Sequence, residues 1–377
     1  MIKLVANIFI FLFLITQFSF ASYIDTDAEM AVVIDADTGK VLFEKDKDKK
    51  TFPASMTKIM TTLIVFEKLS NGTLTLDDKF LVSERAWKER EGSSMFVEVD
   101  KEIRVEDLLR GIIVQSGNDA CIVIAENIAG TEDAFAKMMT NKGVEIGLNN
   151  TNFTNSTGMH NPKNYSTVHD IALLSQYLIN EFPKYYHLFA ETEFEWSGIK
   201  QNNRNPLLYK NMGVDGLKTG HLSKSGYGLA ASAIENGRRI ISVANGFETK
   251  QKRSQGSSRL ITWAFREFDN IKLFDKNSEV GFVKIQGSNK NESTVSTLND
   301  IVITVAKSKK DAISYNVIPI DVVAPVKSGE IAAQLEVIIP KEDPVFFDLI
   351  VTNDVKQTNF IMRFINMIYN FILSLFS

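Results

Sequence analysis

The stretch LLRGIIVQSGNDACIVIAENIAG, residues 108–130, joins two apolar segments through a short polar break. Apolar residues recur at helical spacing through 105–114 and again through 118–129, and Gly130 then ends the second segment. The break holds the tripeptide Ser116-Gly117-Asn118. The stretch therefore predicts two helices with a polar motif held between them.

The segments on either side predict a mixed α/β domain. Two short apolar runs, 31–34 and 40–44, flank a turn-forming sequence and indicate a β-hairpin. Further helices are expected at 55–69, 131–147, 167–180 and about 257–268, and further strands at 226–234 and 239–245. Because the helices are bracketed between early and late strands, we expect one α/β domain with an antiparallel sheet at residues 22–270.

The pattern changes after residue 273. Short β-rich runs follow one another, separated by Asn, Asp, Gly, Lys and Pro, and none is followed by a convincing helix; they span 280–285, 301–306, 315–320, 332–339 and 346–351. This pattern predicts a small all-β domain at residues 273–352. It contains no cluster of reactive side chains, so we interpret it as a spacer.

The N-terminus predicts export from the cytoplasm. A positive start at Lys3 precedes an apolar run from Leu4 to about Ile15, and Ser19-Phe20-Ala21 then supplies the small residues that signal peptidase requires. The run is short for a membrane span. We therefore interpret residues 1–21 as a signal peptide that is removed after Ala21.

The C-terminus predicts contact with a membrane. In NFIMRFINMIYNFILSLFS, residues 359–377, polar residues recur every three or four positions, which places them on one helical stripe with apolar side chains around the rest. This pattern favours an amphipathic helix that lies in the membrane surface; a transmembrane span is the alternative. Together the two ends predict a peripheral protein on the periplasmic face of the inner membrane.

Composition excludes several classes of function. The 377 residues carry a formal net charge of −4, so no basic field would attract nucleic acid. The single cysteine, Cys121, lies among apolar residues and is expected to be a buried small side chain. The four histidines show no zinc-ligand spacing, and neither a metal nor an organic cofactor is expected.

Three motifs in the first domain carry chemistry together. Ser55-Met56-Thr57-Lys58 begins a predicted helix, Ser116-Gly117-Asn118 lies in the helix break, and Lys218-Thr219-Gly220 precedes a strand-like run. Each motif is weak alone, but their order and settings make a strong signal for a serine acyl-transferase. Ser55 is then the nucleophile, and Lys58, one helical turn later, is its general base.

The remaining motif residues have expected roles too. Lys218 would be a second cation that helps to lower the pKa of Lys58, and Ser116 would relay a proton to the leaving amine. Asn118 offers an amide to substrate and to lysine. Gly220 would let a peptide approach the strand edge. The backbone N–H groups of Ser55 and His221 are candidates for an oxyanion hole.

Flanking sequence carries a resemblance to a known family. EGSSMFVEV at 91–99, STGMHNPKNYSTVHDIALL at 156–174 and DGLKTGH at 215–221, followed by SGYGLA at 225–230, resemble the D-alanyl-D-alanine carboxypeptidases, low-molecular-mass penicillin-binding proteins that share a fold with serine β-lactamases. The resemblance runs from about Met30 to Phe268 and more loosely beyond. It implies a β-lactamase/transpeptidase-like α/β fold and removal of the terminal D-alanine from peptidoglycan stem peptides ending in D-Ala-D-Ala, with inhibition by β-lactams.

The resemblance adds one residue and raises one question. Arg253 stands where the family has an arginine near the substrate's terminal carboxylate, and an ordinary surface cation is the alternative interpretation. Leu222 replaces the threonine with which the family's Lys-Thr-Gly-His-Thr motif usually ends. This departure leaves the serine chemistry intact, and Thr219, Ser223 or Arg253 are the residues that could compensate.

Other functions share parts of this pattern. A β-lactamase uses the same motifs, but no Glu-x-x-x-Asn sequence for a deacylating water is recognisable; the candidate glutamates are Glu181, Glu191, Glu193 and Glu195. An endopeptidase that cuts cross-links between wall peptides is compatible with the motifs. A catalytically silent scaffold is disfavoured because Ser55, Lys58 and Lys218 are all present.

Overall fold

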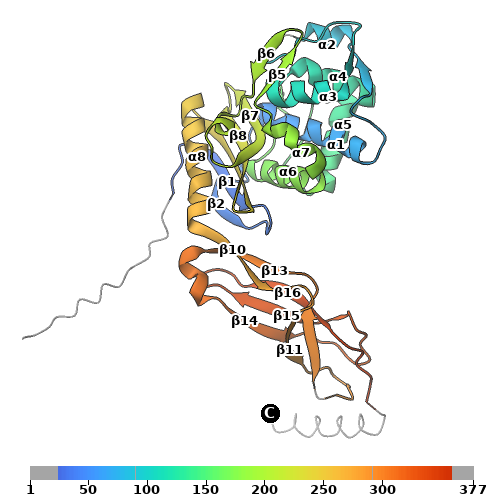
Figure 1. Ribbon diagram of the computed structural model, residues 1–377, viewed down its shortest axis with the longest axis vertical. Helices are drawn as coiled ribbons and strands as arrows, with labels where there is room; N and C mark the ends of the chain where they lie inside the picture. The colour runs from blue at the N-terminus through green and yellow to red at the C-terminus, as the bar shows by residue number, and fades with distance from the viewer. Residues whose placement is uncertain (1–23, 90, 291, 359–377) are drawn as a thin grey trace, which may run out of the picture.

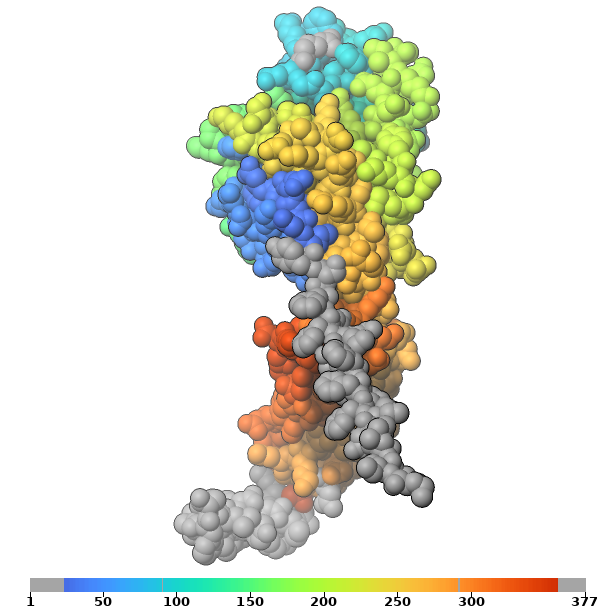
Figure 2. Space-filling model, turned by 90° about the vertical axis from the view of Figure 1, so that its left-hand side faces the viewer, coloured from blue at the N-terminus to red at the C-terminus, as the bar shows by residue number. Residues whose placement is uncertain are grey.

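The computed structural model describes residues 24–89, 91–290 and 292–358. The predicted signal peptide and the predicted helix at 359–377 lie outside these residues. Within them, two bodies are stacked along the long axis, the larger one formed by the first part of the chain and the smaller by the last (Figures 1 and 2). Among the described residues, no helix is long and apolar enough to cross a membrane.

The larger body is built around an antiparallel sheet of five strands in the order β2-β1-β9-β8-β7. The strands are β1 (Met30–Asp35), β2 (Val41–Lys45), β7 (Val214–Leu222), β8 (Gly226–Glu235) and β9 (Arg238–Phe247). Successive residues of β1 enter different cores, with Val32 on one side and Val33 on the other. Both faces of the sheet are therefore covered, and β7 is left as an edge strand.

Helices cover the two faces unequally (Figure 1). Helix α8 (Lys250–Glu267) packs on one face against β8 and β9. The other face carries the large core, in which Phe66 of α1 contacts the rings of Phe182, Tyr185 and Phe189. The helices of this side are α1 (Lys58–Ser70), α2 (Glu84–Lys88), α3 (Val105–Arg110), α4 (Asn118–Ala129), α5 (Glu132–Glu145), α6 (Val168–Glu181) and α7 (Pro183–Tyr186).

Short elements complete this domain. Two small hairpins are formed by β3 (Lys79–Leu81) with β4 (Glu102–Arg104) and by β5 (Glu193–Trp196) with β6 (Ile199–Asn202). Short 3-10 helical turns occur at η1 (Ala54–Thr57), η3 (His187–Ala190) and η4 (Pro206–Tyr209), and a π-helical turn occurs at η2 (Gly111–Gln115). The predicted α/β fold with an antiparallel sheet is confirmed.

Threonine caps fix where several helices begin. The side chains of Thr131, Thr167 and Thr249 each accept a hydrogen bond from the backbone N–H three residues later. Such a cap contributes about 1 kcal/mol to helix stability. The expected start of the last helix, at about residue 257, was wrong because the cap at Thr249 was not recognised; α8 begins at Lys250.

The smaller body is an all-β domain, as expected. Its main sheet has the order β11-β12-β16-β15-β14, and β10 pairs with β13 beside it. The strands are β10 (Phe268–Phe274), β11 (Glu279–Val283), β12 (Ser293–Thr297), β13 (Ile301–Ala306), β14 (Ser314–Pro319), β15 (Ile331–Ile338) and β16 (Val345–Val351). Strands β10 and β12 were not expected, and the tight turn η5 (Lys307–Ala312) follows β13. A separate core of Val, Ile, Leu and Ala side chains holds the domain together.

The two bodies meet at the β1–β2 hairpin. Helix α8 runs directly into β10 at Phe268, whose carbonyl accepts a hydrogen bond from Arg238 at 2.7 Å. Arg238 also pairs with the fully buried Asp35, with 2.7 Å between Nε and Oδ2. On the hairpin, the hydroxyl of Thr38 lies 2.6 Å from that of Thr304 on β13. These polar contacts hold the domains against each other.

Candidate active site

The three motifs meet at one cleft in the larger domain. The cleft has a volume of about 670 Å³ and is bordered by η1, the start of α4, β7 and α8. The predicted residues that line it are Ser55, Ser116, Asn118, Thr219, Gly220, His221 and Arg253. The two predicted lysines lie behind this surface and are buried. A larger groove of about 990 Å³ lies at the domain junction and contains none of the motifs.

Ser55 lies on the turn η1, immediately before α1. The preceding residue, Ala54, has a φ of +50°, in the left-handed region that a non-glycine residue seldom adopts. Strained backbone of this kind often occurs where a side chain must be presented at a fixed angle. Ser55 is half-buried, so its hydroxyl reaches the cleft while its backbone is held by the turn.

Lys58 is held by three oxygen atoms. Its Nζ lies 3.0 Å from the Ser55 hydroxyl, 2.7 Å from Oδ1 of Asn118 and 2.6 Å from the backbone carbonyl of Thr157. Asn118 is oriented by its own amide nitrogen, which donates to the carbonyl of Glu91 at 2.8 Å. Two of the three neighbours of Lys58 can only accept hydrogen bonds. A neutral lysine would therefore donate to these two and turn its lone pair towards the Ser55 hydroxyl.

The surroundings bring the pKa of Lys58 closer to neutral pH. The side chain is fully buried, and this burial lowers the pKa of Lys58 from 10.5 to about 8. The charge of Arg204 also lowers the pKa, whereas those of Asp119 and Glu132 raise it. A lysine with a pKa near the working pH can take up and return a proton.

Lys218 contacts Ser116, not Ser55. Its Nζ donates to the Ser116 hydroxyl at 2.9 Å, and Ser116 adopts the left-handed conformation with φ of +62°. Burial, followed by the charges of Lys58 and Arg204, lowers the pKa of Lys218 well below its ordinary value. Lys218 thus lies beside the expected proton relay, whereas the cation whose charge lowers the pKa of Lys58 is Arg204. The expected strand after this motif is present as β8, but Lys218 itself lies within β7, a strand that the sequence did not indicate.

Gly220 allows two elements to touch. A β-carbon at this position would lie 2.7 Å from the carbonyl oxygen of Pro53 and 3.3 Å from Ala54 and Met56. The close approach in the structure is therefore between β7 and the turn that carries Ser55. This differs from the expectation that the glycine opens the strand edge to a peptide, because a β-carbon in a strand points to the sheet face and not to its edge.

Asp119 is a site residue that the sequence did not single out. Its fully buried carboxylate accepts hydrogen bonds from the backbone N–H groups of Met95, Phe96 and Val97 at 2.7–3.1 Å and from the hydroxyl of Ser94 at 2.6 Å. These bonds anchor the segment that follows Glu91, Gly92 and Ser93, which line the cleft. Its position next to Asn118 in the second motif was the available signal.

Arg253 is a buried cleft residue, and the alternative of a surface cation is wrong. Its side chain is 7% exposed because α8 packs this face against the sheet. Burial lowers the pKa of Arg253 to about 10. Arg204 is a second cleft cation, which the sequence did not indicate; it donates to the Ser93 hydroxyl. The cleft is therefore rich in positive charge and suited to an anionic ligand.

Residues around the third motif complete this end of the cleft. Thr219 is buried, whereas Leu222 and Ser223 lie at the rim of the cleft. The ring of His221 is exposed, and burial of part of it, together with Arg253 and Lys250, lowers the pKa of His221. Leu222 thus borders the cleft with an apolar side chain at the position of the departure from the family motif.

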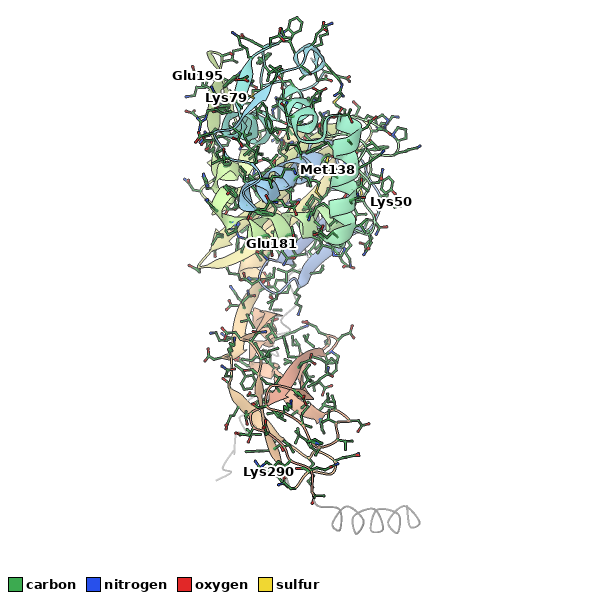
Figure 3. The ribbon with its side chains drawn as sticks, turned by 90° about the vertical axis from the view of Figure 1, so that its right-hand side faces the viewer. Lys50, Lys79, Met138, Glu181, Glu195 and Lys290 are labelled. Atoms are coloured by element: carbon green, nitrogen blue, oxygen red, sulfur yellow. The ribbon has the colours of Figure 1, made fainter. Side chains whose placement is uncertain are left out.

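Several alternatives find no support in the described residues. Glu191 pairs with Arg110, and Glu193 pairs with Lys200. Figure 3 shows Glu195 near one end of the larger domain and Glu181 near the other, and neither lines the cleft. Burial raises the pKa of the Cys121 thiol to about 12, which leaves it protonated. Among the described residues, no group of three His, Cys, Asp or Glu side chains is arranged to hold a metal ion.

Comparison with known proteins identifies the family. A family model for D-alanyl-D-alanine carboxypeptidases matches residues 17–249. The chain belongs to this family. A second model, for the C-terminal domain of penicillin-binding protein 5, matches residues 268–357 and thus the all-β domain. The resemblance seen in the motifs is confirmed, and the protein is a serine D-alanyl-D-alanine carboxypeptidase by family.

Individual relatives agree with this assignment. The D-alanyl-D-alanine carboxypeptidase DacA of Haemophilus influenzae is 34% identical over 88% of this chain and 86% of its own. The structure of penicillin-binding protein 5 from the same organism has a TM-score of 0.84 at 33% identity, covering 89% of this chain and 99% of that one. Penicillin-binding protein D2 of Listeria monocytogenes, solved with ampicillin bound, has a TM-score of 0.59 at 28% identity over 64% of this chain and 99% of its own.

Proposed function

We propose that the protein removes the terminal D-alanine from peptidoglycan stem peptides through an acyl-enzyme on Ser55. The contact between Lys58 and Ser55, 3.0 Å from nitrogen to hydroxyl, carries this proposal. Lys58 is buried and its pKa is lowered to about 8, so about a tenth of it is neutral at pH 7, far more than for an ordinary lysine. Its acceptor neighbours direct the lone pair to the serine, which makes Lys58 the general base.

The acylation step follows from these positions. The peptide adds along the edge of β7 with its carboxylate towards Lys218, Thr219 and Arg253. Ser55 Oγ attacks the carbonyl carbon between the two D-alanines, and its proton passes to Lys58. The oxygen of the tetrahedral intermediate is stabilised by the N–H groups of Ser55 and His221.

The second half returns the enzyme to its starting state. The carbon–nitrogen bond breaks, and D-alanine leaves with a proton delivered through Ser116, which Lys218 holds by its 2.9 Å hydrogen bond. Water then attacks the ester, which releases the shortened peptide as a carboxylate and restores the Ser55 hydroxyl. A β-lactam would acylate Ser55 in the same way, and the resulting ester would be stable to water.

The location of the protein belongs to the same proposal. A signal peptide at 1–21 would deliver the chain across the inner membrane, and the amphipathic segment 359–377 would then hold it at the periplasmic surface. Deletion of 359–377 from the exported protein should move it from the membrane fraction to the soluble periplasmic fraction. Retention in the membrane fraction after this deletion would contradict the anchoring role.

The chemistry is tested with three forms of the exported protein: wild type, Ser55→Ala and Ser70→Ala. Ser70 lies exposed at the end of α1, so its replacement is a matched control. Each form is labelled with a fluorescent penicillin and assayed for D-alanine release from a D-Ala-D-Ala peptide. Wild type and the control should show both reactions, and Ser55→Ala neither.

The other outcomes discriminate between the alternatives. Labelling without D-alanine release, together with cleavage of a cross-linked wall peptide, would indicate an endopeptidase. Labelling followed by rapid turnover of the penicillin would indicate a β-lactamase. Absence of both labelling and release in the wild-type protein would leave a silent scaffold.

A further inference from the structure

Two predicted site residues contact one aromatic ring, that of Tyr227. Tyr227 lies on β8 directly opposite His221 of β7 and lines the cleft. The His221 ring stacks on it with 3.9 Å between ring centres and 23° between planes. The guanidinium carbon of Arg253 lies 5.8 Å from the centre of the same ring. Tyr227 therefore connects the third motif on β7 with the arginine on α8.

Arg253 needs such a neighbour because it is a buried cation without a protein anion. Within the described part of the chain it forms no ion pair, and its buried Nε has no hydrogen-bond partner. An uncompensated buried charge is costly, and the face of an aromatic ring is one of the few neutral groups that attracts a cation. With a pKa of about 10, Arg253 still carries its charge at neutral pH. The open hydrogen-bonding capacity of Arg253 fits an incoming carboxylate.

The departure at Leu222 makes this arrangement matter more. Leu222 borders the cleft and has no hydroxyl with which to bind a carboxylate. Thr219 is buried to 6% exposure and gives one hydroxyl, so the orientation of Arg253 becomes a larger part of carboxylate recognition. A bidentate arginine–carboxylate pair depends strongly on the angle at which the planar guanidinium is held.

We propose that Tyr227 is a positioning residue that sets the specificity for a free terminal carboxylate, because its ring orients Arg253 beside the third motif. This inference rests on the proposed carboxypeptidase function. Tyr227 touches no reacting atom; it acts through Arg253, with His221 stacked on the ring to keep it in place. Its replacement should weaken binding of substrates that end in a carboxylate and leave the serine chemistry unchanged.

The experiment compares Tyr227→Leu, Tyr227→Phe, Arg253→Met and the Tyr227→Leu/Arg253→Met double variant. kcat/KM for D-alanine release is measured with a D-Ala-D-Ala peptide and for D-alaninamide release with the same peptide amidated at its C-terminus. Tyr227→Leu should lose about tenfold on the carboxylate substrate, mainly in KM, and little on the amide. Tyr227→Phe, which keeps the ring face, should resemble wild type.

The double variant decides whether Tyr227 acts through Arg253. This comparison needs only the carboxylate substrate, so it holds even if the wild-type enzyme does not cleave the amide. If Tyr227 acts through Arg253, the double variant should be no worse than Arg253→Met alone. Additive losses, or equal losses on both substrates, would overturn the inference; Tyr227→Met replaces Tyr227→Leu if the latter does not fold. A wild-type protein that takes up penicillin on Ser55 but releases no D-alanine would instead refute the carboxypeptidase function.

Discussion

The side-chain oxygen of Asn118 lies 2.7 Å from the nitrogen of Lys58, and this contact helps to decide which way a neutral Lys58 turns its lone pair. The amide nitrogen of Asn118 is committed to the carbonyl of Glu91, so the oxygen has no other orientation that keeps both bonds. The second motif thus controls the base of the first.

The acylation rate of the wild-type enzyme should have an acid limb near pH 8. Burial lowers the pKa of Lys58 to about 8, so the neutral base predominates above that pH and is lost below it. The second-order rate constant for acylation by a penicillin should fall about tenfold for each pH unit below this limb. Stopped-flow acylation between pH 5 and 9 measures it, and a limb below pH 6 would contradict the role of Lys58 as base.

Replacing Asn118 by aspartate should move this limb upward. A carboxylate at the position of the amide places a negative charge 2.7 Å from Lys58 and stabilises the ammonium, which raises its pKa. Acylation at pH 7 should then fall about tenfold or more, and part of the loss should return at higher pH. Asn141→Asp, an exposed change on α5, is the control. An unchanged pH profile in Asn118→Asp would show that residue 118 does not influence the pKa of Lys58.

Replacing Gly220 by alanine should impair acylation while the fold survives. The added methyl group would lie 2.7 Å from the Pro53 carbonyl, so β7 and the Ser55 turn must move apart. A displacement of about 1 Å between reacting groups can cost roughly 100-fold in rate. Gly143→Ala on α5, where the nearest atom is 3.6 Å away, should be harmless. Equal penicillin acylation in both variants would show that β7 tolerates the shift.

The sequence predicted the motifs well because each is a local pattern. Ser55 and Lys58 lie one helical turn apart, and Ser116 and Asn118 flank one residue, so their proximity depends on little more than secondary structure. That the three motifs share a cleft came from the family resemblance. Their order along the chain does not reveal the contact of Lys218 with Ser116, which needs the packing of β7 against the helices.

What the sequence did not reveal depends on packing between distant segments. Arg253 was ambiguous because a Lys-rich run can lie on either face of a helix, and only the position of α8 against the sheet decides that it is buried. The early start of α8 is not visible in the apolar pattern, because residues 250–259 hold no large apolar side chain and helical spacing begins only at Leu260. The contact of Gly220 with the turn at Pro53 is not visible in the sequence, because the two residues are far apart along the chain.

Asp119 should affect both stability and the pH profile. Asp119→Asn keeps the size of the side chain but replaces the carboxylate that accepts hydrogen bonds from the backbone N–H groups of residues 95–97 by a neutral amide. Hydrogen bonds to a charged group contribute more than neutral ones, so the free energy of unfolding should fall by about 2 kcal/mol. Denaturant unfolding measures this loss, with the exposed Asp311→Asn as the control.

The same substitution separates an electrostatic effect from a purely structural one. The Asp119 charge raises the pKa of Lys58, so its removal should lower that pKa and move the acid limb of acylation below pH 8, opposite to the shift in Asn118→Asp. The rate on the plateau should fall as well, because the segment behind Glu91, Gly92 and Ser93 loses its anchor at the cleft. A plateau loss with no movement of the acid limb would leave Asp119 as an anchor of this segment alone.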